Sequence, residues 1–243
     1  MKKCIVLIFF LSILWAGHMH AQSWLQRGMD IFRDHPENNQ SKRLPESDIA
    51  AGLREALKVG SENVVSHLGR ENGFYLDPRA HISLPEGLQQ VQHLMNRAGM
   101  GRMLDDLEVR MNRAAEMAVP KAKDMFAQAI SSMTLEDAYS IYTGPDDSAT
   151  RYFQNRMSTP LADEFQPVVR QSLSEAGAVR LYEDLMSDYQ QLPFVPDVSV
   201  DLSRHVVDRS IMAIFDYLAL EEAAIRNNPA KQTTDILRRV FGR

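Results

Sequence analysis

Apolar residues recur every three or four positions along most of the chain after residue 45, which is the spacing of one face of an α-helix. The first such stretch begins near Ser47, a residue that favours helix starts, and ends at Gly69. Further stretches with this period cover 86–98, 102–118, 121–133, 135–143, 145–173, 178–190, 203–225 and 236–241. The pattern predicts an all-α protein: a multi-helix bundle in a single domain over residues 46–243.

Two of these stretches have features of their own. Residues 203–225 are apolar almost all round, which is typical of a central, buried helix. Residues 145–173 contain Pro160 and Pro167, and proline supplies no backbone N–H and clashes with the preceding turn. We therefore expect the prolines to kink or divide that helix.

Residues 70–85 interrupt the helical period. Asn72-Gly73 and Asp77-Pro78 are turn signals, yet the segment is too apolar for a free loop. We expect it to lie across the helices, and a minor strand is an additional expectation for residues 81–84.

Asp146 and Asp147 follow Gly144-Pro145, where two adjacent carboxylates raise the question of a metal site. A calcium-binding EF-hand loop needs acids at alternating positions around a central Gly, and this stretch lacks that spacing. Pro145 is a favourable first helical residue, and acids stabilise the positive end of a helix. The sequence therefore predicts a helix start here and no metal.

Charge spacing supports the helices. Thr134 and Asp137 have the spacing of a capping box, in which each side chain accepts from the backbone N–H of the other residue. Acids also precede arginines by four positions, the better order for a helical ion pair, at Asp106/Arg110, Asp147/Arg151, Glu222/Arg226 and Asp235/Arg239.

The first 21 residues have the organisation of a secretory signal peptide. Lys2 and Lys3 precede an apolar run from Cys4 to Gly17, and a short polar stretch ends at Ala21. A retained membrane anchor is the alternative, but the run is shorter than the ~20 residues of a membrane span. We expect cleavage, a periplasmic bacterial envelope protein with no transmembrane helix in its mature chain, and a linker with a short amphipathic segment over 22–45.

The composition excludes some kinds of site and of partner. The chain is 44% hydrophobic and 24% charged, as in an ordinary globular protein. Its one cysteine, Cys4, lies in the predicted signal, so the mature chain would lack disulfides and thiolate sites. Removing Lys2 and Lys3 changes the formal net charge from −5 to −7, which argues against broad binding of nucleic acid.

The chain lacks the sequence motifs of common catalytic and cofactor sites. The mature histidines are never paired four residues apart, and no H-E-x-x-H, G-x-S-x-G or phosphate-binding glycine loop occurs. We therefore predict no metal site, no cofactor and no catalytic residues of a known class, so an enzyme is the less favoured reading.

Two clusters remain as candidate sites. Glu108, Asn112 and Glu116 fall on one helical stripe, either as a buried acid cluster for acid–base chemistry or as a solvated face. Seven methionines lie within 95–133, either as core filler, as copper ligands or as part of an adaptable apolar groove. The residues proposed to line that groove are Phe74, Tyr75, Met103, Met111, Met125 and Phe215.

Three segments resemble a known family in their order along the chain. They are MNRAAEMAVPKAKDMFAQAI (111–130), MTLEDAYSIYTGPDDSATRYF (133–153) and EEAAIRNNPAKQTTDILRRVFG (221–242). Together they resemble the uncharacterised bacterial exported proteins grouped as domain of unknown function 4197, over roughly residues 46–242. The resemblance implies an all-helical envelope protein and no particular site residues. The chain departs from the family pattern at Tyr217, where relatives are expected to have Gly.

These observations leave three hypotheses. The first is a non-enzymatic binding or interaction module whose apolar groove takes an apolar small molecule or an envelope protein. The second is an enzyme with an unfamiliar carboxylate site at Glu108 and Glu116. The third is a structural protein that docks another subunit through its C-terminal helix.

Overall fold

The structure is a computed structural model that describes residues 44–97, 99, 101–191 and 198–242. The predicted signal peptide and most of the predicted linker lie outside the described residues. The chain divides into one unit over Met1–Leu44 and a second over Pro45–Arg243, and the second unit contains all the helices discussed below.

Every regular element in the described part of the chain is helical, which confirms the all-α single-domain prediction. The α-helices are α2 (Glu46–Leu68), α3 (Glu86–Arg97), α4 (Arg102–Ala118), α5 (Ala122–Ser131), α6 (Leu135–Thr143), α7 (Ser148–Glu175), α8 (Ala178–Gln190), α9 (Leu202–Asn227) and α10 (Asp235–Phe241). Two short 3₁₀ turns, η1 (Val119–Lys121) and η2 (Pro229–Lys231), connect neighbouring helices.

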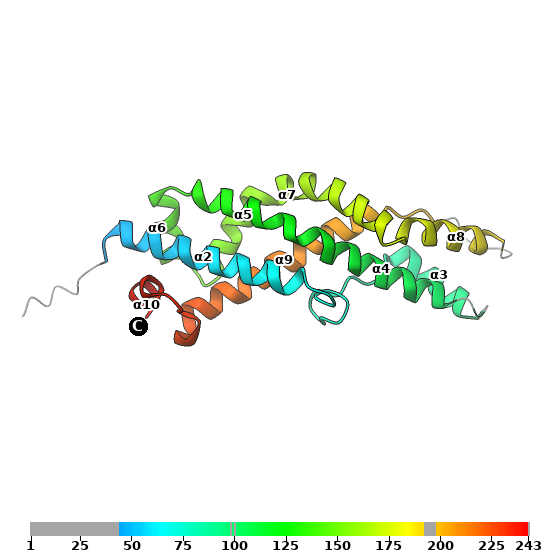
Figure 1. Cartoon of the computed structure of the whole chain (residues 1–243), viewed down its shortest axis with the longest axis horizontal. Coiled ribbons are helices and arrows are strands. Elements are labelled where there is room, and N and C mark those ends of the chain that lie inside the picture. Colours follow the sequence, from blue (N-terminus) through cyan, green and yellow to red (C-terminus); the bar gives the residue numbers. More distant parts are fainter. Residues whose placement is uncertain (1–43, 98, 100, 192–197, 243) are drawn as a thin grey trace, which may run out of the picture. The chain divides into compact units, whose positions relative to one another are not determined.

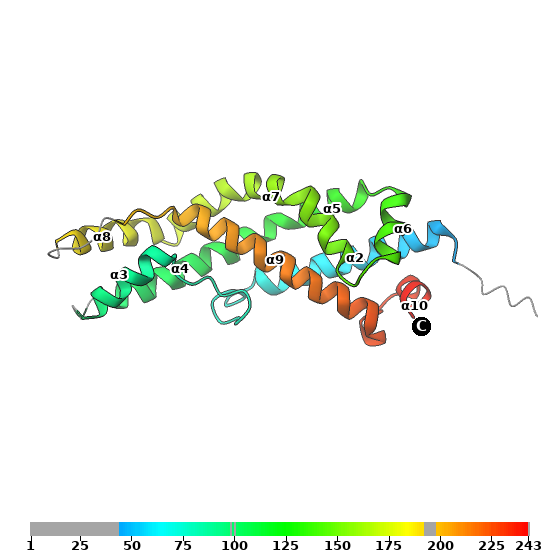
Figure 2. The ribbon, with the colours of Figure 1, turned by 180° about the vertical axis from the view of Figure 1, so that it is seen from behind.

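Helix α9 is the centre of the packing, as its apolar composition predicts. It contacts α7, α2, α4 and α10, while α4 also packs against α7 and α8. Figures 1 and 2 show α9 running alongside α2 and α4, with α3 and α8 towards one end of these helices and α6 and α10 towards the other. Val206, Ile214 and Leu218 of α9 are among its fully buried side chains.

The structure agrees with the predicted caps and ion pairs at the helix ends, except in two places. Thr134 and Asp137 form the predicted capping box, and Arg151 pairs with Asp147 at 2.8 Å. Helix α7 begins at Ser148, three residues after the predicted Pro145, because residues 145–147 form a turn first. Asp235 pairs with Arg238 at 2.6 Å and not with Arg239.

The two prolines of α7 do not divide it. Pro160 and Pro167 both lie inside the helix, and both are exposed. Seven residues is about two helical turns, so the prolines share the solvent-facing side, where the carbonyls that lose their N–H partners can bind water. The expected division of the helix is therefore wrong, and the expected kink stays a prediction.

The predicted minor strand at 81–84 is also wrong, because residues 81–85 form no regular structure. The backbone N–H groups of Ile82 and Leu84 donate to side chains of α4 instead of to a neighbouring strand. In the described residues, no helix combines the length and apolar character that crossing a membrane requires.

Candidate functional site

The three residues of the predicted acid cluster lie together, and they hold the chain between α2 and α3. Asn112 is fully buried, accepts from the N–H of Ile82 at 2.9 Å and donates to the carbonyl of Ile82 at 2.8 Å. One amide side chain thus makes the pair of hydrogen bonds that a strand would make. We call Glu108, Asn112 and Glu116 the anchor stripe.

The two carboxylates of the anchor stripe also bind backbone. Glu116, which is 4% exposed, accepts from the N–H groups of Phe74 and Tyr75 at 3.1 and 3.3 Å and from Arg113 at 2.6 Å. Glu108 accepts from the N–H of Leu84 at 3.0 Å. These contacts occupy both carboxylates, which favours a structural role over the acid–base alternative.

A histidine completes the attachment to Glu108. His81 Nε2 lies 2.9 Å from Glu108 Oε1, and its Nδ1 lies 2.8 Å from the carbonyl oxygen of Tyr75. Both distances are those of hydrogen bonds, and which ring nitrogen donates depends on the tautomer. The side chain therefore ties segment 74–84 to itself and to α4.

Asp77 fixes the other side of the same segment. Its carboxylate accepts from the N–H groups of Arg79 and Ala80 at 2.9 and 3.0 Å, and it lies 2.9 Å from His67 of α2 and 2.5 Å from the hydroxyl of Tyr217 of α9. Burial opposes its ionisation, but the hydrogen bonds from Tyr217, His67 and the two N–H groups outweigh burial and lower the pKa from 3.8 to about 2. Burial and then the bond to Asp77 raise the pKa of Tyr217 to about 12.

The residues proposed for an apolar groove occupy mixed environments. Phe74, Met111 and Phe215 are buried in the core, whereas Tyr75, Met103 and Met125 are half-buried. A groove that used the buried three would require the helices to separate. The groove stays a prediction, and the pockets described next are lined by other residues.

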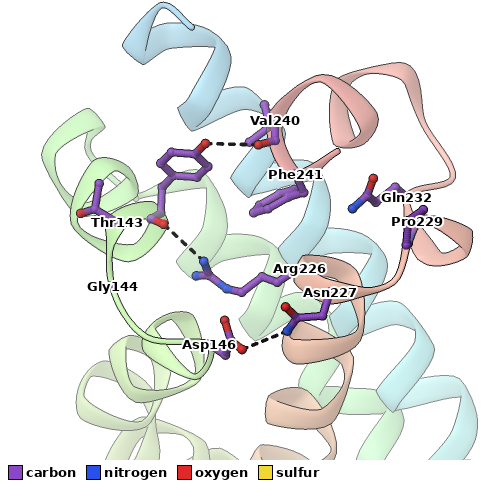
Figure 3. A pocket seen from close by; sticks show the side chains of 10 residues that line it. Thr143, Gly144, Asp146, Arg226, Asn227, Pro229, Gln232, Val240 and Phe241 are labelled. Carbon is purple, nitrogen blue, oxygen red and sulfur yellow. Dashed lines mark hydrogen bonds between the residues drawn. The ribbon is translucent and has the colours of Figure 1, made fainter. Parts of the chain in front are cut away.

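A pocket of about 640 Å³ lies where the ends of α6 and α9 meet η2 and α10 (Figure 3). We call it the C-terminal pocket. Its lining residues are Tyr142, Thr143, Gly144, Asp146, Arg226, Asn227, Pro229, Gln232, Val240 and Phe241.

Arg226 lines the C-terminal pocket and pairs with Glu222, which is not part of the lining. The guanidinium donates to Glu222 Oε1 from Nη2 at 3.0 Å and to the carbonyls of Ile141 and Tyr142 at 2.8 and 3.3 Å. The side chain of Arg226 is only 10% exposed and that of Glu222 only 5%. This confirms the predicted Glu222/Arg226 pair and shows that it joins α9 to the end of α6.

Three other residues of the C-terminal pocket carry oxygen acceptors. Asn227 Nδ2 donates to Asp146 Oδ2 at 2.9 Å, and Gln232, which is 3% exposed, donates to the carbonyl of Ile225 at 3.1 Å. Within the described residues, Asp146 Oδ1, Asn227 Oδ1 and Gln232 Oε1 have no hydrogen-bond partner. Figure 3 shows these three side chains around the same space as Arg226.

A second, open pocket of about 590 Å³ lies between α2 and α9 beside Asp77. His67, Arg70, Tyr217, Glu221 and Lys231 are among its lining residues. Lys231 pairs with Glu221 at 3.3 Å, so part of its charge is already neutralised.

The sequence drew attention to Asp146 and to the Glu222/Arg226 pair but did not connect them. Asp146 precedes Arg226 by 80 positions, and Gln232 has no signal of its own in a polar stretch. Their proximity follows from the packing of the end of α6 and the turn after it against α9, and from the way η2 follows α9. Among the described residues, no three His, Cys, Asp or Glu side chains gather as a metal site would require.

Comparison with protein families identifies a family for this chain. The family model described as "Protein of unknown function (DUF4197)" matches residues 43–242. Neither the curated proteins nor the solved structures contain a significant match to the chain.

Proposed function

The chain belongs to this family of proteins of unknown function, and we propose that it is a binding module whose C-terminal pocket takes a small organic cation with an ammonium group. The single observation that carries the proposal is that three residues lining the pocket, Asp146, Asn227 and Gln232, each have a side-chain oxygen without a partner in the described part of the chain.

Charge supports a cationic ligand. Glu222, which does not line the pocket, neutralises Arg226, and both side chains are nine-tenths or more buried. Asp146 is the remaining charged group of the lining, and its contact is with the neutral amide of Asn227. The pocket therefore has one uncompensated negative charge at its edge.

Hydrogen-bonding capacity points the same way. An ammonium group has three donors and no acceptor, which complements a carboxylate oxygen and two amide oxygens. A divalent metal fits less well, because Ca²⁺ takes six to eight oxygen ligands and Mg²⁺ prefers several waters with one or two carboxylates. The aromatic ring of Tyr142 adds a surface that attracts cations, whereas the ring of Phe241 already has the guanidinium of Arg226 5.9 Å from its centroid.

The first hypothesis, a binding module, is thus kept, but with a polar pocket in place of the apolar groove. The third hypothesis loses support because Leu237, Val240 and Phe241 of α10 are buried within the chain's own bundle. We also propose that the protein acts in the periplasm after signal cleavage. Cell fractionation with N-terminal sequencing tests this: an intact residue 1 in a cytoplasmic fraction would contradict it.

Isothermal titration of the purified protein with putrescine, ethanolamine and glucosamine tests the ligand class, with glucose and acetate as uncharged and anionic comparisons. We expect saturable binding of at least one amine and none of glucose or acetate. Asp146→Asn should weaken that binding about tenfold or more, because it removes the charge and keeps the shape. Asp147→Asn is the matched control, since Asp147 pairs with Arg151 and does not line the pocket.

Two outcomes would contradict the proposal. One is the absence of binding by all three amines at millimolar concentration. The other is equal affinity in the wild type and Asp146→Asn, which would place any amine site elsewhere.

A further inference from the structure

We infer that the ligand of the C-terminal pocket carries a neutral oxygen acceptor in addition to its ammonium group, as amino alcohols and amino sugars do. The inference rests on the proposed function and narrows its ligand class. It comes from Arg226, which lines the pocket and has one N–H group without an acceptor in the described part of the chain.

A count of the N–H groups of Arg226 identifies the free donor. A guanidinium has five N–H donors: one on Nε and two on each of Nη1 and Nη2. The Nε group donates to Glu222 at 3.3 Å, and Nη2 donates to Glu222 at 3.0 Å and to the carbonyl of Ile141 at 2.8 Å. Nη1 donates to the carbonyl of Tyr142 at 3.3 Å. Within the described residues, the second N–H of Nη1 therefore has no hydrogen-bond acceptor.

The free N–H belongs to a side chain that is held in place. Arg226 is only 10% exposed, and its bonds to α9 and to the end of α6 fix the plane of the guanidinium. The ring of Phe241, 5.9 Å away, is at most a weak acceptor. A largely buried donor without an acceptor costs free energy, so a ligand oxygen that accepts from it removes that cost.

The free donor and the acceptor oxygens of the pocket lie around one space. Asn227 follows Arg226 on α9, and its amide donates to Asp146 at 2.9 Å. Tyr142, whose carbonyl accepts from Nη1 of Arg226, precedes Asp146 by four positions. Figure 3 shows Arg226, Asn227 and Asp146 around the same space. One small molecule can therefore contact both the carboxylate of Asp146 and the free N–H of Arg226.

The charges around the pocket favour a neutral oxygen over a carboxylate on the ligand. Glu222 already neutralises Arg226, and Asp146 is the charged residue of the lining that lacks an opposite charge. An ammonium group balances Asp146, and a hydroxyl, ether or carbonyl oxygen adds no further charge. A carboxylate on the ligand would instead be repelled by Glu222 and Asp146. Amino acids should therefore bind more weakly than amino alcohols.

Isothermal titration of the purified protein with matched pairs of amines tests the inference, in a buffer without Tris, which is itself a hydroxylated amine. Ethanolamine is compared with ethylamine, and aminopentanol with pentylamine, so that the second pair allows a longer separation of nitrogen and oxygen. In at least one pair, the hydroxylated amine should bind about tenfold more tightly, which is the gain from one hydrogen bond to a charged donor. Glycine should bind more weakly than ethanolamine.

Two variants assign the preference to Arg226. Arg226→Lys keeps the charge but removes the planar set of donors, so the tenfold preference should fall below about twofold. Asp146→Asn should weaken both members of a pair and leave their ratio unchanged. If the melting temperature shows that Arg226→Lys does not fold, the comparison of the matched amines on the wild type still decides.

Failure of this inference and failure of the proposed function give different results. An absence of binding by every amine contradicts the proposed function and this inference with it. Three outcomes overturn the inference alone and leave the ammonium site in place: equal affinities within both pairs, tighter binding of glycine than of ethanolamine, or a preference that survives in folded Arg226→Lys.

Discussion

Glu222 of α9 accepts two hydrogen bonds from Thr150 of α7, one from its backbone N–H and one from its hydroxyl, each at 2.9 Å. The same carboxylate accepts from the N–H of Ala149, also at 2.9 Å. A residue of the central helix thus caps the first turn of α7, for which Asp147 supplies no side-chain hydrogen bond. The capping of α7 and the ion pair with Arg226 therefore both depend on the buried carboxylate of Glu222.

Replacing Glu222 by Gln should lower the free energy of unfolding by about 2–4 kcal/mol, because the change leaves Arg226 with a neutral partner in a buried position. Urea unfolding at neutral pH measures this. Glu221→Gln changes a neighbouring carboxylate whose partners are exposed, so it should cost less than about 1 kcal/mol. Equal losses in the two variants would contradict the assigned role of Glu222.

Replacing Asn112 by Leu should destabilise the fold by about 2–4 kcal/mol, because the N–H and carbonyl of Ile82 would stay buried without partners. Hydrogen exchange should show faster exchange at the amides of Ile82 and Leu84. Asn63→Leu, a change at an exposed position of α2, is the control and should alter stability by less than about 0.5 kcal/mol. Unchanged exchange at Ile82 would argue against the anchor stripe.

Low pH should lower the free energy of unfolding, because protonation of Asp77 weakens the hydrogen bonds that attach segment 74–84 to α2 and α9. The pKa of Asp77 falls from 3.8 to about 2 on folding, so its contribution is complete above pH about 4 and is lost as the pH falls towards 2. Because the carboxylate is partly exposed, we expect a loss of about 1–2 kcal/mol. Unfolding of wild type and Asp77→Asn at pH 5 and pH 2.5 measures it: the difference between the two proteins should shrink at the lower pH. A difference that is constant between the two pH values would rule out the linkage.

Replacing Pro160 by Ala should stabilise the protein by about 1–2 kcal/mol. Alanine restores a helical N–H within α7, and this gain exceeds the loss from the higher conformational entropy of the unfolded chain. Pro145→Ala, outside any helix, should give no gain. Thermal unfolding of both variants measures the effect, and a lower melting temperature for Pro160→Ala would show that the proline is needed for the path of α7.

Local signals in the sequence predicted the helices and their ends well. The capping box at Thr134 and the Asp147–Arg151 pair join residues three or four positions apart, so they can be recognised from the sequence alone. The prediction that the prolines would divide α7 is wrong because their cost depends on which side of the helix faces water. That information comes from packing and not from residue type.

The candidate site could be predicted only in part for the same reason. Helical periodicity shows that Glu108, Asn112 and Glu116 lie on one stripe of α4. The backbone groups that they bind belong to segment 74–84, which is not helical and has no periodic pattern to predict its position. Tyr217 was noticed as an unusual residue, and its hydroxyl proves to bind Asp77, 140 positions away. Contacts at such separations follow from how the helices assemble.

The anchor stripe has a consequence for how this region can vary. Asn112, Glu108 and Glu116 grip main-chain N–H and carbonyl groups, which nearly every amino acid carries in the same place. Substitutions at outward positions such as Leu76 or Ser83 would then leave the route of the polypeptide intact. The same main-chain path is therefore compatible with many different side chains on its outer face.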